Sequence, residues 1–145
     1  FKQKTAYEIR LSLVGSEMCI RDRGDLTFVN SAGSPAIRLE SSTPGVASPM
    51  HALAYAAMAC MGMDLVHILQ KGRHELKGLK VHFDGERAAD YPKRYTAMHL
   101  RFEVTGDVPE DAVARALELS HEKYCSVSNS IRTDIAFTTS FTVSK

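Results

Sequence analysis

The feature that most constrains the fold of this chain is an apolar, alanine-rich stretch from Ala52 to Leu69. A surface helix carries a polar face, whereas a helix that is apolar around its whole circumference has to be covered by other elements. Just before the stretch, Ser48 is a favourable N-cap, and Pro49 is favourable at a first helical position because its missing N–H is not needed there. We therefore expect a long, central, buried helix from Pro49 to about residue 71.

The segments around this helix have the two-residue period of half-buried strands and one further helical pattern. A short hairpin is expected around residues 31–35, and Pro109 opens a second helix that should run to Tyr124 and Cys125. The order ββ-α-ββ-α-β predicts an α+β fold with an antiparallel sheet packed around two helices. The apolar strand positions are Leu26, Phe28, Ile37, Leu39, Leu79, Val81, Phe83, Met98, Leu100, Phe102, Val104, Ile135, Phe137, Phe141 and Val143.

Size and composition exclude several functional classes. With 145 residues and 44% hydrophobic residues, the chain can bury one core without a disulfide framework. Its 18 basic and 17 acidic residues give no broad positive field, so a nucleic-acid partner is not expected. The sequence contains no uninterrupted run of 18 apolar residues, so we do not expect a membrane span. Three cysteines are too few for a stapled secreted scaffold, which favours a reducing, cytoplasmic compartment.

Residues 1–23 resemble a translated DNA adapter. A DNA sequence that encodes Lys2 to Ile9 resembles a primer used in short-read sequencing, and one that encodes Leu13 to Asp22 in the same frame resembles a transposase adapter end. We therefore expect a non-native segment at 1–23 and a single domain at 24–145, in which the native N-terminal strand is replaced. The alternating pattern from Tyr7 to Leu13 leaves a genuine first strand as the alternative.

Candidate chemistry centres on two cysteines. Cys60 lies midway along the apolar helix, and Asp64 and His67 follow four and seven residues later, so all three project from nearly the same face. Cys125 ends the second helix. Such a pair suits a peroxide-attacking thiolate and a resolving thiol that captures its sulfenic acid. A free cysteine in an apolar helix can equally be a small core residue, whereas the Asp64 carboxylate requires a hydrogen-bond donor.

A zinc site built on Cys60, Asp64 and His67 is a further alternative. Their spacing allows one helix face to present all three, but a fourth ligand such as His51, His121 or Cys125 would be needed. No CxxC or HExxH motif accompanies them, and we do not expect a metal.

Two segments resemble the signatures of the OsmC/Ohr family. Residues 48–66 read SPMHALAYAAMACMGMDLV and are similar to its central-helix signature, and residues 118–128 read ELSHEKYCSVS and are similar to its second signature. With Glu86 and Arg87 before Pro92, the resemblance extends over residues 24–145. The pattern of Cys60 followed by Asp64 is most similar to a subgroup of OsmC-like redox proteins.

The resemblance implies an OsmC-like fold and an intertwined homodimer with both cysteines in each active site. In peroxidase members the counterpart of Cys60 attacks an organic hydroperoxide, and the counterpart of Cys125 closes a disulfide that an external dithiol reopens. No metal or bound cofactor is implied. A positioned arginine would stabilise the developing charges, with Arg38 as the candidate by position and Asp64 as a possible supporting residue.

The chain departs from the peroxidase pattern beside Pro49. Peroxidase members carry a glutamate shortly after this proline that holds the activating arginine, whereas Met50 and His51 follow it here. Two functions therefore stay open at this point. One is a thiol-dependent peroxidase that uses Cys60 and Cys125, and the other is a non-enzymatic OsmC-like dimer that binds a ligand or senses redox state.

Overall fold

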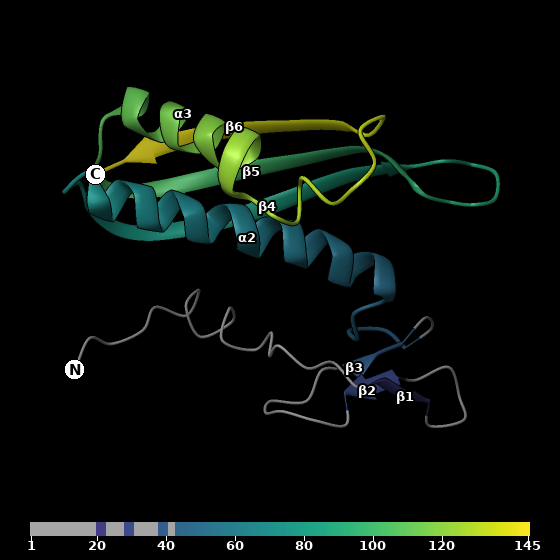
Figure 1. Cartoon of the computed structure of the whole chain (residues 1–145). Helices are drawn as coiled ribbons and strands as arrows, with labels where there is room; N and C mark the ends of the chain where they lie inside the picture. The colour runs from purple at the N-terminus through teal and green to yellow at the C-terminus, as the bar shows by residue number, and fades with distance from the viewer. Residues whose placement is uncertain (1–19, 23–27, 31–37, 41–42) are drawn as a thin grey trace. The chain divides into compact units, whose positions relative to one another are not determined.

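The computed structural model describes residues 20–22, 28–30, 38–40 and 43–145 (Figure 1). The chain divides into two compact units, residues 1–56 and 57–145, so the boundary falls inside the long helix. The predicted boundary near residue 23 lies in a part that the description does not cover.

Helix α2 spans Pro49–Lys71, as the sequence predicts. Its start is capped reciprocally, because the His51 N–H donates to Ser48 Oγ and the Ser48 N–H donates to His51 Nδ1, both at 3.2 Å. Lys71 lies in its last turn, at the negative end of the helix dipole.

The buried side of α2 is a narrow stripe rather than the whole circumference. Residues four apart are fully or almost fully buried, and they are Ala57, Met61, Leu65 and Leu69. The other side keeps exposed apolar groups, with Tyr55 at 55% and Met63 at 46%. Within one chain, the expected burial on all sides is thus not reached.

By length and composition α2 is apolar enough to cross a membrane, although the sequence has no uninterrupted apolar run of that length. A core helix meets the same criteria, and Met61, Leu65 and Leu69 belong to the hydrophobic core of residues 57–145. Packing therefore accounts for the apolar composition of this helix.

The main sheet contains β4 (Glu75–Arg87), β5 (Tyr95–Asp107) and β6 (Ala136–Ser144) in that order (Figure 1). β4 and β5 pair antiparallel, with Leu79 opposite Val104 and Phe83 opposite Leu100. β6 pairs parallel to β5, with Leu100 opposite Thr139, so the expectation of a wholly antiparallel sheet is wrong for this pair. The reason is the connection, because a helix between two neighbouring strands returns the chain in the same direction.

The core of residues 57–145 lies between one face of this sheet and the two helices. Met98, Leu100, Phe102 and Val104 alternate along β5 and are buried. Helix α3 (Glu110–Leu119) buries Val113, Ala116 and Leu117 in the same cluster that holds Met61, Leu65 and Leu69 of α2. The alternation along β5 thus creates one apolar face, against which both cysteine-bearing helical segments pack.

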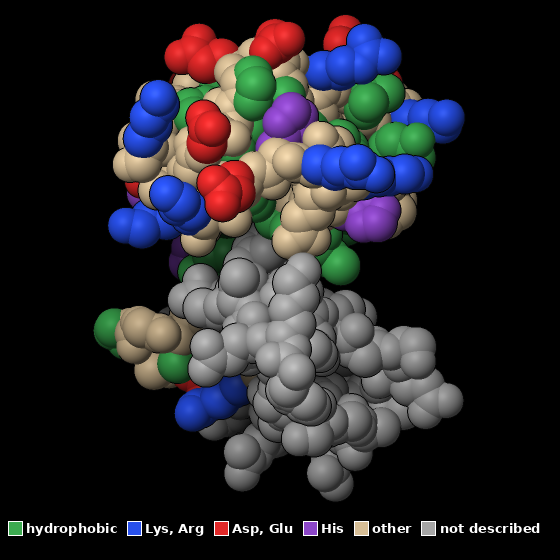
Figure 2. Space-filling model, turned by 90° about the vertical axis from the view of Figure 1, so that its left-hand side faces the viewer, with side chains coloured by type: hydrophobic (Ala, Val, Ile, Leu, Met, Phe, Trp, Pro, Cys, Tyr) green, Lys and Arg blue, Asp and Glu red, His purple; other side chains and the backbone are tan. Residues whose placement is uncertain are grey.

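The opposite face of the sheet is polar. Glu103 on β5 contacts His82 Nε2 and Arg101 Nη1, each at 3.0 Å. His82 and then Arg101 hold the pKa of this carboxyl below its usual range. Figure 2 shows acidic and basic side chains interspersed on one side of the molecule, with neither sign forming a continuous patch there.

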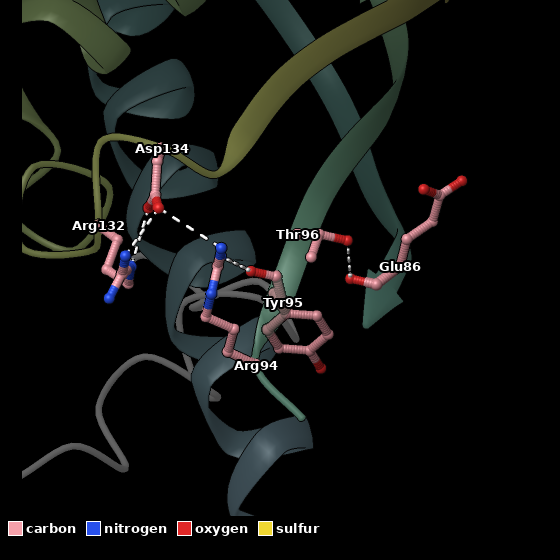
Figure 3. Close-up of polar contacts among 6 residues, drawn as sticks. All are labelled: Glu86, Arg94, Tyr95, Thr96, Arg132 and Asp134. Atoms are coloured by element: carbon pink, nitrogen blue, oxygen red, sulfur yellow. Dashed lines mark hydrogen bonds and ion pairs between the residues drawn. The ribbon is translucent and has the colours of Figure 1, made fainter. Parts of the chain in front are cut away.

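An ion-pair cluster connects the chain before β6 to the start of β5 (Figure 3). Asp134 accepts two hydrogen bonds from Arg132, at 2.8 and 2.7 Å, and lies 3.4 Å from the Arg94 guanidinium. Arg94 also donates to the Tyr95 carbonyl at 3.0 Å. Asp134 thus joins two chain segments that lead into neighbouring strands.

The N-terminal unit contains a small antiparallel sheet. It consists of β1 (Ile20–Asp22), β2 (Phe28–Asn30) and β3 (Arg38–Leu39), with Phe28 opposite Leu39. The pairing of β2 with β3 is the expected hairpin, while its turn and the pattern from Tyr7 to Leu13 lie outside the described residues. Part of the adapter-like segment, Ile20–Asp22, supplies the third strand.

Candidate active site

Cys60 is placed by the packing of α2. It directly precedes Met61 of the buried stripe, so its side chain lies at the edge of that stripe and is half-buried. Its Sγ is 3.8 Å from Ser126 Oγ. The thiol is therefore held on a rigid helix and keeps access to solvent.

Cys125 follows a widened helical turn. The α-helix expected to reach Tyr124 ends at Leu119 and continues as one π-helical turn, Ser120–Tyr124. The Cys125 N–H donates to the Ser120 carbonyl at 2.7 Å, and Cys125 itself is extended, which ends the turn. Asn129 Nδ2 then donates to the carbonyls of His121 and Cys125, at 3.0 and 2.8 Å. π-turns of this kind recur at functional sites.

Asp64 lies one helical turn after Cys60, and its carboxylate has the donor that its apolar surroundings demand. Ser120 Oγ donates to Asp64 Oδ2 at 2.7 Å. This bond connects the middle of α2 to the π-turn that leads to Cys125, so it fixes the two cysteine-bearing segments against each other.

The structure brings three of the predicted residues together. The Sγ atoms of Cys60 and Cys125 and a carboxylate oxygen of Asp64 all lie within 4.8 Å of one another, and both thiols are free. Cys125 is completely buried. These three atoms could together hold a soft metal ion, and the two sulfur atoms could form a disulfide.

The other sequence candidates lie outside this three-residue group. His67 is exposed and does not join the three-residue group. His51 is bonded to Ser48, and His121 stacks on Phe137 at a centroid distance of 5.0 Å. In the N-terminal unit, Arg38 forms an ion pair with Glu40, whose side chain is only 5% exposed.

The surroundings of Cys125 favour its protonated form. Burial raises the pKa of the Cys125 thiol, and the neighbouring Cys60 adds to this rise. Two hydrogen bonds to Ser128 act in the opposite direction, one of which is the Ser128 N–H donating to Cys125 Sγ at 3.3 Å. Burial is the larger effect, so the two thiols differ in environment.

Comparison with known proteins shows the family of the chain. Residues 42–140 match the model of the OsmC-like protein family. The chain belongs to the OsmC-like family. Protein YhfA of Escherichia coli strain K12 is 40% identical over 121 residues, which cover 81% of this chain and 90% of YhfA.

Solved structures of the OsmC-like fold superpose on most of the chain. A hypothetical protein from Aquifex aeolicus VF5 has a TM-score of 0.81 at 29% identity, over 89% of this chain and 96% of that one. An organic hydroperoxide resistance protein OsmC from Legionella pneumophila has a TM-score of 0.68 at 17% identity, over 90% and 98% of the two chains. The second likeness shows the fold alone.

The sequence analysis did not identify three serines as site residues. Ser120, Ser126 and Ser128 contact Asp64, Cys60 and Cys125 respectively. The available signal was the density of serine around Cys125, because small hydroxyl residues beside a buried cysteine can supply the donors that buried polar atoms need.

Proposed function

We propose that this OsmC-like chain is a thiol-dependent peroxidase that reduces organic hydroperoxides, with Cys60 as the attacking thiol and Cys125 as the resolving thiol. The observation that carries the proposal is the convergence of the two sulfur atoms from separate helical segments within 4.8 Å. A modest approach of the side chains brings such sulfurs to bonding distance. The difference in exposure supports these roles, because of the two cysteines that the structure describes Cys60 is partly accessible to a substrate and Cys125 is buried.

The reaction balances with these two thiols and one external reductant. The Cys60 thiolate attacks the distal peroxide oxygen, the O–O bond breaks, and the alkoxide takes up a proton to leave as an alcohol. The Cys60 sulfenic acid is then attacked by Cys125 sulfur, which forms the disulfide and releases water. An external dithiol reduces the disulfide by exchange and is itself oxidised. The proposal includes no bound cofactor or metal.

Activation of Cys60 requires a nearby cation, for which Arg38 is our candidate. Its guanidinium is held by the buried Glu40 carboxylate, and an anchored guanidinium suits stabilisation of a thiolate and a departing alkoxide. Asp64 has a supporting role, because its bond to Ser120 holds the two cysteine segments together.

The proposed assembly is a cytoplasmic homodimer. Support comes from the apolar side of α2 that a single chain leaves exposed, including Tyr55 and Met63. Exposed apolar area of this kind marks interaction surfaces. A second copy of the chain is the proposed occupant.

The decisive experiment follows consumption of cumene hydroperoxide with an excess of dithiol. A Cys19→Ser chain is the reference, because it retains only the two site thiols. We expect turnover in the reference, none in Cys60→Ser, and in Cys125→Ser a Cys60 that over-oxidises at excess peroxide. Peptide mapping after one equivalent of peroxide should find a Cys60 to Cys125 disulfide in the reference.

Arg38→Ala, compared with Arg73→Ala as a matched loss of one guanidinium, tests the activating cation. We expect slower turnover only for Arg38→Ala. Absence of turnover in a folded, reduced reference protein would contradict the peroxidase proposal and leave the non-enzymatic, ligand-binding or redox-sensing dimer.

A further inference from the structure

The reduced site has a property that the peroxidase reaction does not use. Two thiols and one carboxylate, from Cys60, Cys125 and Asp64, have their ligand atoms within 4.8 Å of one another. In the part of the chain that the structure describes, Asp64 takes part in no ion pair. Full deprotonation would therefore place three negative charges together, an arrangement that a divalent cation compensates.

The distances fit a small tetrahedral ion. With zinc bond lengths of about 2.3 Å to sulfur and 2.0–2.2 Å to oxygen, ligand atoms on one zinc ion lie about 3.6–3.8 Å apart. Ligand atoms that lie within 4.8 Å of one another reach this geometry when side-chain rotations move them by roughly 1 Å. The donors come from one rigid helix and one hydrogen-bonded turn, so no large backbone movement is needed.

The outer contacts are those of a supported metal site. Ser120 Oγ donates to Asp64 Oδ2, which orients the carboxylate beside the two sulfurs. The Ser128 N–H donates to Cys125 Sγ and stabilises that sulfur as a thiolate. Two sulfur donors select a thiophilic ion over magnesium or calcium.

We infer that the reduced site binds one Zn²⁺ ion through Cys60 Sγ, Cys125 Sγ and the Asp64 carboxylate, with the fourth position open to water. Binding releases the two thiol protons, so the affinity rises with pH. The bound ion occupies both sulfurs and withholds them from peroxide, and a disulfide between them removes the site. The inference rests on the donor set alone and does not require the peroxidase activity.

The test is a titration of the full-length, reduced Cys19→Ser protein with Co²⁺, a spectroscopic probe for zinc sites. We expect one Co²⁺ per chain, a thiolate-to-cobalt charge-transfer band in the near ultraviolet, and displacement of the band by Zn²⁺. Cys60→Ser and Cys125→Ser should each lose about half of the band and bind at least tenfold more weakly. Asp64→Asn should keep the band and lose roughly tenfold to hundredfold in affinity.

Matched controls separate this site from surface binding. His67→Ala removes an exposed ligand-type residue of the same helix, and it should leave the titration unchanged. Oxidation to the disulfide should abolish binding, with circular dichroism confirming that each variant is folded. The inference is overturned if the reduced protein shows no charge-transfer band, or if binding is unchanged in the double cysteine variant. Peroxide turnover, measured separately without metal, reports on the proposed reaction alone.

Discussion

The two segments that supply the cysteines are held in place by different forces. Around Cys60, helix α2 is fixed by apolar packing of residues such as Met61 and Leu65, and Cys60 itself packs at the edge of this core. Around Cys125, the segment of residues 120–130 is also fixed by hydrogen bonds from serine and asparagine side chains, besides the burial of Cys125 in the core. A rigid, accessible thiol thus faces a buried thiol on a hydrogen-bonded turn.

This difference suits a pair of thiols with separate tasks. Packing on one side of α2 holds Cys60 in position without covering it. The hydrogen-bonded turn buries Cys125 completely and favours its neutral form. Such a turn can also rearrange at lower cost than a packed helix, because exchanging hydrogen bonds with water costs less than opening a cavity.

The largest expected effect is loss of packing on α2. Leu65 is fully buried in the core, so Leu65→Ala should lower the free energy of unfolding by about 2–5 kcal/mol. Met63→Ala, on the exposed side of the same helix, should change it by less than about 0.5 kcal/mol in the monomeric state. Urea denaturation followed by circular dichroism measures both. Equal effects would contradict the one-sided burial of α2.

The hydrogen-bonded segment should respond less strongly. Asn129→Ala removes two bonds to the carbonyls of His121 and Cys125 and should cost about 1–2 kcal/mol. Glu122→Ala removes an exposed side chain of the same segment and is the control. Hydrogen exchange at the Cys125 amide should accelerate in Asn129→Ala alone. An unchanged exchange rate would mean that Asn129 does not hold this turn.

How far each segment can be predicted from sequence follows from the same contrast. The apolar run, Ser48 and Pro49 are local signals, and together they define α2 to its first residue. The spacing of Cys60 and Asp64 likewise places both on one helix face. The π-turn is stabilised by contacts such as Ser120 with Asp64, which are far apart in sequence, so no local pattern indicates it. Strand alternation also carries no direction, which is why the parallel pairing of β6 was not predicted.

The next prediction concerns the reactivity of the two thiols toward an alkylating reagent. Burial raises the pKa of Cys125 and blocks its surface, so iodoacetamide should modify Cys60 at least about tenfold faster at neutral pH. Mass spectrometry of the Cys19→Ser protein over time gives both rates. In urea the two rates should converge, which shows that the difference belongs to the folded state. Faster modification of Cys125 would reverse the proposed roles.

The smallest expected effect concerns the chain that follows the Cys125 segment. Arg132, and to a lesser extent Arg94, lower the pKa of Asp134 from 3.8 to about 2. Because the folded state favours the carboxylate, the stabilisation is present above about pH 4 and is lost as the pH falls through 2. Asp134→Asn should therefore lower the midpoint of thermal unfolding slightly at pH 6 and by less at pH 2. Added salt should reduce the difference at pH 6 because the ion pairs are exposed. Asp90→Asn removes a carboxylate with no ion pair among the described residues and is the control.

A pH-independent loss of stability in Asp134→Asn would mean that Asp134 acts through its shape and neutral hydrogen bonds. The acid sensitivity assigned to this segment would then be wrong.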